Sequence, residues 1–198
     1  MKTILLATGN QNKAKEIKVL LDNVFDVVTM KDFGIDIDII EDGLTFEENA
    51  LIKVRALKPF VKGKDIILMG DDSGLSVDFL DGAPGIYSAR YAGEDVDDAA
   101  NNQKLLEVMK EVPKEKRGAS FITAIAIIFP DGHEIICRGE VQGTIAFDYC
   151  GKGGFGYDPL FIHRSTGKSF AEMTKEEKNR LSHRAAAVAK AKTFLLDE

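Results

Sequence analysis

Two neighbouring carboxylates follow an apolar run in the first half of the sequence. Asp71 and Asp72 follow residues 66–69, from which Gly70 separates them, and Gly74 comes two positions after Asp72. Carboxylates at the end of a buried strand are unfavourable unless a metal ion or another cation balances them. A surface turn or an Asx turn explains the same residues without chemistry. An aspartic protease is excluded. Its catalytic dyad needs a second such motif or a small all-β dimer, and the helical patterns of this sequence contradict both.

A second acidic group lies upstream. Glu41 and Asp42 precede Gly43, and Glu48 and Lys53 follow on a predicted helix. Oxygen ligands of this kind suit Mg²⁺, which commonly takes one or two carboxylates and keeps several waters. An acidic run of this type is also typical of a solvated loop.

Residues 8–13 join a short predicted strand to a predicted helix. The start of a helix presents free backbone N–H groups and a partial positive charge, which suit phosphate. An ordinary strand-to-helix turn favours the same residue types, so both interpretations stay open. The residues concerned are Thr8, Gly9, Asn10, Gln11, Asn12 and Lys13.

A glycine-rich stretch at residues 151–159 is the fourth candidate. Its formal GxGxxG is not a dinucleotide site, since no helix opens after it. A glycine-rich turn that displays Phe155 and Asp158 can hold a flat base by stacking, and a long hairpin return is the alternative. The central residues are Phe155, Gly156, Tyr157 and Asp158.

Three cationic or ionisable side chains near the C-terminus complete the set. Lys178 and Arg184 are natural partners for phosphate and for a base carbonyl oxygen, and His183 lies beside Arg184. A single histidine among charged helix residues is more often merely exposed. On one straight helix Lys178 and His183 would face different ways, so a shared site requires a break, for which Ser182 is a plausible N-cap.

The elements that position these residues form an α/β pattern. Strands alternate with helices early in the chain, and Pro130 to Gly132 gives a strong hairpin signal. Thr45 with Glu48 and Thr174 with Glu177 form capping boxes, and Pro59 should kink or end its helix. The predicted strands cover residues 3–7, 24–30, 66–69, 75–79, 119–129 and 134–147, with a turn at 70–74 and helices after residue 13, after residue 45, over 98–112 and in the tail.

Composition narrows the class of protein. The 198 residues are 44% hydrophobic and 29% charged, which predicts one soluble globular domain over residues 1–198. The net charge of −6 argues against a nucleic-acid-coating protein. No apolar run is long enough for a membrane span or a signal peptide. With two unpaired cysteines, Cys137 and Cys150, we expect a reducing cytoplasm.

The order of the motifs resembles the inosine triphosphate pyrophosphatase family, which hydrolyses non-standard purine nucleoside triphosphates to the monophosphate and pyrophosphate. The resemblance runs nearly end to end. It rests on residues 6–10, 41–46, 71–74, 82–90, 153–159 and 182–184.

The resemblance implies an elongated mixed α/β fold, with a cleft between two lobes, and a homodimer. Residues 8–13 match the triphosphate grip and Ser73 a substrate contact. Their positive charge makes Lys13 and Lys53 the residues expected to stabilise the leaving pyrophosphate. Asp72 matches the general base and a Mg²⁺ ligand, and Glu41 a second Mg²⁺ ligand. The base and its sugar-phosphate are assigned to Phe155, Gly156, Tyr157, Asp158, Lys178, His183 and Arg184.

His183 and Arg184 would donate hydrogen bonds to the six-position carbonyl of hypoxanthine or xanthine. Adenine has an amino group at that position, so these donors would have no acceptor. No residue that would reject guanine is identified. Two alternatives stay open: a pyrophosphatase of related fold for modified pyrimidine nucleotides, and a nucleotide-binding regulator without catalysis. The presence of Glu41 and Asp72 argues against the regulator, because a sensor needs no water-activating carboxylate.

Overall fold

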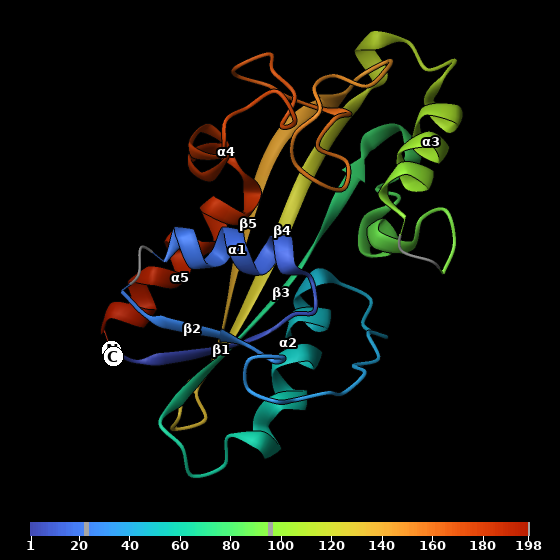
Figure 1. The fold of residues 1–198 in the computed structure, drawn as a ribbon. Coiled ribbons are helices and arrows are strands. Elements are labelled where there is room, and N and C mark those ends of the chain that lie inside the picture. The colour runs from blue at the N-terminus through green and yellow to red at the C-terminus, as the bar shows by residue number, and fades with distance from the viewer. Residues whose placement is uncertain (22–23, 95–96, 198) are drawn as a thin grey trace. The chain divides into compact units, whose positions relative to one another are not determined.

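The computed structural model describes residues 1–21, 24–94 and 97–197 of the chain. Within these residues the strands form one mixed sheet in the order β2-β1-β3-β4-β5-β6 (Figure 1). β1 pairs in parallel with β2 and with β3, whereas β5 and β6 are antiparallel. The strands are β1 Thr3–Ala7, β2 Asp26–Thr29, β3 Ile66–Val77, β4 Gly118–Ile128, β5 Glu134–Ile145 and β6 Phe161–His163. The predicted mixed α/β class is confirmed.

The chain folds into two compact units. The first contains Met1–Asp72, Thr123–Gly139 and the segment from Arg184 onward, and the second contains Ser73–Ile122 and Glu140–His183. The long strands β3, β4 and β5 therefore contribute residues to both units.

In the first unit, helices cover both faces of the parallel strands. Alternate residues of β1 and β3 pack with α1 (Gln11–Leu20) and with α5 (His183–Asp197). The part of α5 from Arg184 onward belongs to this unit. The opposite face meets α2 (Phe46–Leu57), because a Cβ added at Gly70 would lie 2.8 Å from Cγ1 of Val54. The residues on the α1 and α5 side include Ile4, Leu6, Ile17, Ile67, Met69 and Val188.

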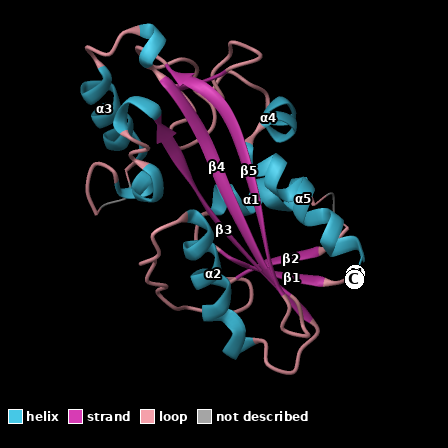
Figure 2. Ribbon diagram, turned by 180° about the vertical axis from the view of Figure 1, so that it is seen from behind, coloured by secondary structure: helices cyan, strands magenta, loops and turns pink. Residues whose placement is uncertain are grey.

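The second unit has its own apolar core, in which phenylalanine rings pack against one another and against aliphatic side chains. Phe121 lies 4.7 Å from Phe161 and 5.7 Å from Phe170, measured between ring centroids. The ends of β3, β4 and β5 supply part of this core, and helix α3 (Asp98–Met109) adds Leu105 and Met109. Helix α4 (Lys175–Leu181) lies later in the chain and belongs to the same unit. Figure 2 shows α3 and α4 as helices and the long loops between the elements in a separate colour.

One predicted element is wrong. Residues 70–74 do not form a turn: β3 is a single strand that runs through both aspartates to Val77, and residues 78–80 then form a 3₁₀ turn. Gly70 allows β3 to pack closely against α2 and does not reverse the chain. A Cβ at this position would also lie 2.9 Å from the backbone oxygen of Ala50. Burial and contact with α2 therefore outweigh the local turn preference of these residues.

The predicted helix boundaries are largely confirmed. α2 ends at Leu57 and a 3₁₀ turn containing Pro59 follows. The capping box of Thr174 and Glu177 is complete. The other predicted capping box is only half formed. The Thr45 hydroxyl accepts from Glu48 N–H, but the Glu48 carboxylate accepts from the N–H of Leu44 and not from that of Thr45.

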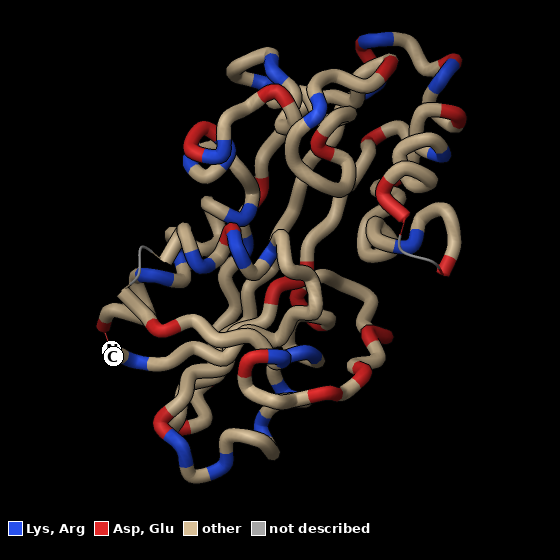
Figure 3. The backbone as a smooth tube through the Cα atoms, viewed as in Figure 1, with Lys and Arg blue, Asp and Glu red and all other residues tan. Residues whose placement is uncertain are grey.

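The predicted break between Lys178 and His183 is also present, since α4 ends at Leu181 and α5 begins at His183 with Ser182 extended between them. Charged residues of both signs occur along the backbone of both units (Figure 3). In the described ranges, no helix has both the length and the apolar character needed to cross a membrane.

Candidate active site

A carboxylate and ammonium cluster lies in the first unit. Lys53 projects from α2, and its Nζ lies 2.8 Å from Oε2 of Glu41 and 2.8 Å from Oδ1 of Asp72. The same ammonium donates to the backbone oxygen of Asp71 at 3.0 Å. The structure thus brings Asp72 of one predicted motif together with Glu41 and Lys53 of another.

Burial and charge act in opposite directions on this cluster. Burial lowers the pKa of Lys53, but the charges of Asp72 and Glu41 outweigh it and the net shift is upward. Burial also raises the pKa of Asp72, and the nearby Lys53 and Lys13 only partly oppose the shift. Asp72 is therefore a better proton acceptor than an ordinary aspartate.

The cluster fits a divalent cation that arrives with phosphate. Glu41 and Asp72 already direct carboxylate oxygens at one cationic group, the Lys53 ammonium. Oδ2 of Asp72 is buried and has no hydrogen-bond partner in the described part of the chain. Within that part, no three or more His, Cys, Asp and Glu side chains gather as a metal site. Two carboxylates suffice for Mg²⁺, which completes its octahedron with waters and phosphate oxygens.

Asp71 organises a second set of charges behind Asp72. Its Oδ1 lies 2.8 Å from Nζ of Lys13, and its Oδ2 accepts from Nε of Arg184 at 3.1 Å. Arg184 also pairs with Glu16 of α1. Burial would raise the pKa of Asp71, but Arg184 and Lys13 outweigh it and hold that pKa far below its usual value. The Lys13 ammonium is consequently directed by a permanent negative charge.

Arg184 is only 1% exposed, and its guanidinium bonds two carboxylates of the first unit. Burial lowers the pKa of Arg184, yet Asp71 and Glu16 raise it further, so the side chain is a fixed cation. Its predicted contact with a base remains a prediction.

The segment between β1 and α1 has the expected helix-cap geometry. Asn10 is the N-cap of α1, and its Oδ1 accepts from the N–H groups of Asn12 and Lys13 at 2.9 and 3.1 Å. Oγ1 of Thr8 accepts from Asn10 N–H at 3.1 Å. The side chain of Lys13 points to Asp71, so this helix start carries both partial and full positive charge.

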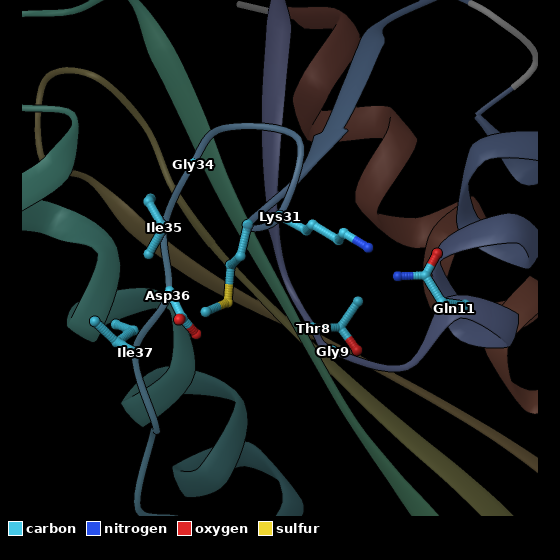
Figure 4. Close-up of a pocket in the computed structure, with 9 residues that line it drawn as sticks. Thr8, Gly9, Gln11, Lys31, Gly34, Ile35, Asp36 and Ile37 are labelled. Atoms are coloured by element: carbon cyan, nitrogen blue, oxygen red, sulfur yellow. The ribbon is translucent and has the colours of Figure 1, made fainter.

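A pocket of about 520 Å³ opens beside this segment (Figure 4). Thr8, Gly9 and Gln11 form one side of it, and the stretch after β2 forms the other. Figure 4 shows the Lys31 side chain directed toward Gln11. Sequence reasoning missed the second side, although the parallel strands β1 and β2 must end at the same edge of the sheet. The missed lining residues are Met30, Lys31, Gly34, Ile35, Asp36 and Ile37.

The glycine-rich stretch and α4 build a separate cluster in the second unit. Oδ2 of Asp158 accepts from Phe155 N–H at 2.9 Å and from Nζ of Lys178 at 2.6 Å. The Lys178 ammonium also lies 4.4 Å from the centroid of the Phe155 ring, a cation–π distance. Asp158 and Lys178 are buried while Phe155 is half-buried. These three predicted residues do lie together.

His183 is not an exposed helix residue. It is 4% exposed, and its ring stacks on Phe121 with centroids 4.6 Å apart. Tyr157 is likewise buried and donates its hydroxyl to the backbone oxygen of Ser88 at 2.7 Å. Burial raises the pKa of Tyr157 far above the usual range of a phenol. Ser73, half-buried in β3, follows Asp72 directly in the chain.

A family model described as the Ham1 family matches residues 4–194. The chain belongs to the Ham1 family. This confirms the resemblance that the order of the motifs had indicated. Ham1 proteins of known structure have the same fold: the Staphylococcus aureus protein is 39% identical with a TM-score of 0.87 over 99% of each chain. The Coxiella burnetii protein is 38% identical with a TM-score of 0.87 over the whole of both chains.

Curated relatives carry the name dITP/XTP pyrophosphatase. The Clostridium perfringens protein is 48% identical over 98% of both chains. The Escherichia coli protein is 46% identical over 95% of both chains. Full-length similarity to Ham1 proteins therefore includes every segment that contributes to the two clusters.

Proposed function

We propose that this protein hydrolyses non-standard purine nucleoside triphosphates, namely inosine, deoxyinosine and xanthosine triphosphate, to the monophosphate and pyrophosphate. It thereby removes these nucleotides from the pool. The observation that carries the proposal is the buried carboxylate of Asp72, whose pKa is raised by burial, beside Glu41 and Lys53. Its setting in a Ham1 chain with relatives named dITP/XTP pyrophosphatase supports the reaction and the substrate class.

Glu41 and Asp72 would hold Mg²⁺, consistent with the two carboxylates that converge on Lys53. When bound, the ion neutralises phosphate charge and makes a nearby water more acidic. Asp72 orients the attacking water and takes its proton, for which an unpartnered Oδ2 and a raised pKa are suitable. The attack is at the α-phosphorus.

The cations of the first unit act on the leaving group. Lys13 and Lys53 neutralise the charge that develops on pyrophosphate, and the start of α1 adds the partial positive charge of the helix. The carboxylate of Asp71 keeps Lys13 in place before substrate arrives. Thr8, Gly9, Asn10, Gln11 and Asn12 bind the triphosphate, and Ser73 contacts the substrate beside Asp72.

Recognition of the base is assigned to the glycine-rich stretch, α4 and the residues that begin α5. Phe155 provides the stacking surface, and Gly156, Tyr157, Asp158 and Lys178 shape its surroundings. Donors of His183 and Arg184 face the six-position carbonyl of hypoxanthine or xanthine. Adenine would leave these donors unmatched, at a cost of ~1–3 kcal/mol for each buried donor.

The protein acts as a cytoplasmic homodimer on this small-molecule substrate. Sedimentation equilibrium measures the assembly directly, and a mass equal to one chain at micromolar concentration would contradict the dimer.

Product analysis tests the reaction. The protein is incubated with inosine, xanthosine, adenosine and guanosine triphosphates, each with and without Mg²⁺. We expect monophosphate and pyrophosphate from the inosine and xanthosine substrates, and only with the metal. Equal cleavage of all four would contradict base selection, and release of single phosphate would contradict attack at the α-phosphorus.

A further inference from the structure

Helix α3 contains two adjacent buried asparagines, Asn101 and Asn102, which are 2% and 3% exposed. Asparagine is a poor helix former, and burial of its amide is unfavourable without hydrogen bonds. Asn101 donates to the backbone oxygen of Ala89 at 2.9 Å and accepts from Ala92 N–H at 2.7 Å. Asn101 therefore holds the segment that precedes α3.

Asn102 holds a different part of the second unit. Its Nδ2 donates to the backbone oxygen of Gly156 at 2.8 Å. Asp98 lies four residues earlier, on the same face of α3, and its Oδ2 accepts from Gly156 N–H at 2.7 Å. One face of α3 thus satisfies both backbone polar groups of a single glycine.

That glycine follows Phe155 directly. Gly156 has a φ of +60°, in a stretch that the structure assigns to neither helix nor strand. On the other side of the turn, Phe155 N–H is held by Asp158, which also binds Lys178. The backbone on both sides of the Phe155 ring is therefore fixed by side chains, on one side by Asp158 of the same glycine-rich stretch and on the other by Asp98 and Asn102 of α3.

We propose that Asp98 and Asn102 are positioning residues for purine binding, which act through Gly156 on the Phe155 ring. The inference rests on the proposed function, since it takes Phe155 as the surface on which the base stacks. Neither side chain touches the base. Loss of either bond lets the turn leave the conformation that presents the ring, so the affinity for the base falls while the chemistry at phosphorus continues unchanged.

The test compares inhibition by the two products. Inosine monophosphate carries the base, and inorganic pyrophosphate does not. Inhibition constants of both, with kcat and KM for inosine triphosphate, are measured for Asn102→Ala and Asp98→Ala. Loss of one hydrogen bond predicts an inhibition constant for inosine monophosphate about five- to tenfold higher. The inhibition constant for pyrophosphate and the kcat should stay at the wild-type values.

Two further variants separate positioning from general weakening of the helix. Asp98→Asn keeps an oxygen for Gly156 N–H and should restore most of the affinity for inosine monophosphate. Asn101→Ala removes an equally buried amide that bonds Ala89 and Ala92 instead, and should leave both inhibition constants unchanged.

Unchanged affinity for inosine monophosphate in Asn102→Ala and Asp98→Ala would overturn the inference. So would a parallel loss of affinity for pyrophosphate, or the same effect in Asn101→Ala. Failure of the proposed function is distinguishable, because it appears in the wild-type protein as absence of monophosphate and pyrophosphate release.

Discussion

Asp71 and Asp72 are neighbours in sequence, yet they experience opposite electrostatic environments. Asp71 binds Lys13 and Arg184, and its pKa is lowered far below the usual value. Asp72 shares Lys53 with Glu41, and burial raises its pKa. The first is a permanent charge that orders other residues, and the second is the residue we propose as the base. Adjacent residues on a strand point to opposite faces, which allows this division.

Substitution of Asp72 by asparagine tests its role as the base. We expect Asp72→Asn to lower kcat about 10²–10⁴-fold, the usual contribution of a positioned general base. The amide has nearly the same size as the carboxylate, so binding of a non-hydrolysable inosine triphosphate analogue should remain largely intact in calorimetry.

Asp65→Asn is the matched control, because Asp65 is an exposed carboxylate just before the same strand. It should leave kcat unchanged. Full activity in Asp72→Asn would remove Asp72 from the mechanism.

His163 provides a pH test of the second unit. It is buried at the end of β6, its Nδ1 lies 3.2 Å from Oγ1 of Thr166, and burial lowers its pKa below 6.5. As pH falls from 6.5 toward the lowered pKa, the unfolded chain binds a proton that the folded chain does not. The free energy of unfolding should therefore fall with acidity in this window.

The measurement is urea unfolding of wild type and of His163→Gln across that window. Subtracting one curve from the other removes the titration of all other groups. We expect the wild-type free energy of unfolding to fall relative to that of the variant as pH decreases. A constant difference, or one that grows toward acid pH, would show that His163 is not held neutral by the fold.

At the scale of elements, local sequence signals were informative where local interactions decide the outcome. Apolar periodicity predicted the helices and most strands, the complete box of Thr174 and Glu177 predicted the start of α4, and Pro59 predicted the end of α2. The continuity of β3 was not predictable in this way. Gly70 and Gly74 signal a turn locally, but the contact of Gly70 with α2 depends on a helix that precedes it in the chain.

For the candidate site, too, the sequence indicated some features and not others. The types of its residues were evident from sequence, since carboxylates, lysines and a glycine-rich turn carry recognisable chemistry. Their partners were not: Lys53 with Glu41, Asp71 with Arg184, and His183 with Phe121 all depend on tertiary contacts. The bonds from α3 to Gly156 were missed for the same reason.

Gly70→Ala tests the packing of β3 on α2. The added methyl would lie within 3.0 Å of Cγ1 of Val54 and of the backbone oxygen of Ala50, and the helix backbone cannot yield cheaply. We expect the free energy of unfolding to fall by about 1–3 kcal/mol in urea titrations, as for other overpacked sites. Gly9→Ala is the control for stability alone, because no heavy atom lies within 4 Å of its added Cβ. Equal stability of the two variants would contradict this account of β3.

At the scale of the whole molecule, each compact unit carries one of the two clusters. The first holds the carboxylates and cations that suit a triphosphate and its metal, and the second holds the Phe155 turn with Asp158 and Lys178. Asp72 and Ser73 mark the passage of β3 from one unit to the other. The similarity to Ham1 proteins covers both units, because the family model matches residues 4–194 and the Staphylococcus aureus structure aligns over 99% of the chain.

We propose that water attacks the α-phosphorus of a non-standard purine triphosphate, with Asp72 as the base. Hydrolysis of inosine triphosphate in water labelled with heavy oxygen, with Mg²⁺ present, identifies the phosphorus that is attacked. Mass spectrometry then shows which product carries the label. We predict label in inosine monophosphate and unlabelled pyrophosphate. Label in pyrophosphate, or in single phosphate, would show attack at a different phosphorus and contradict the account.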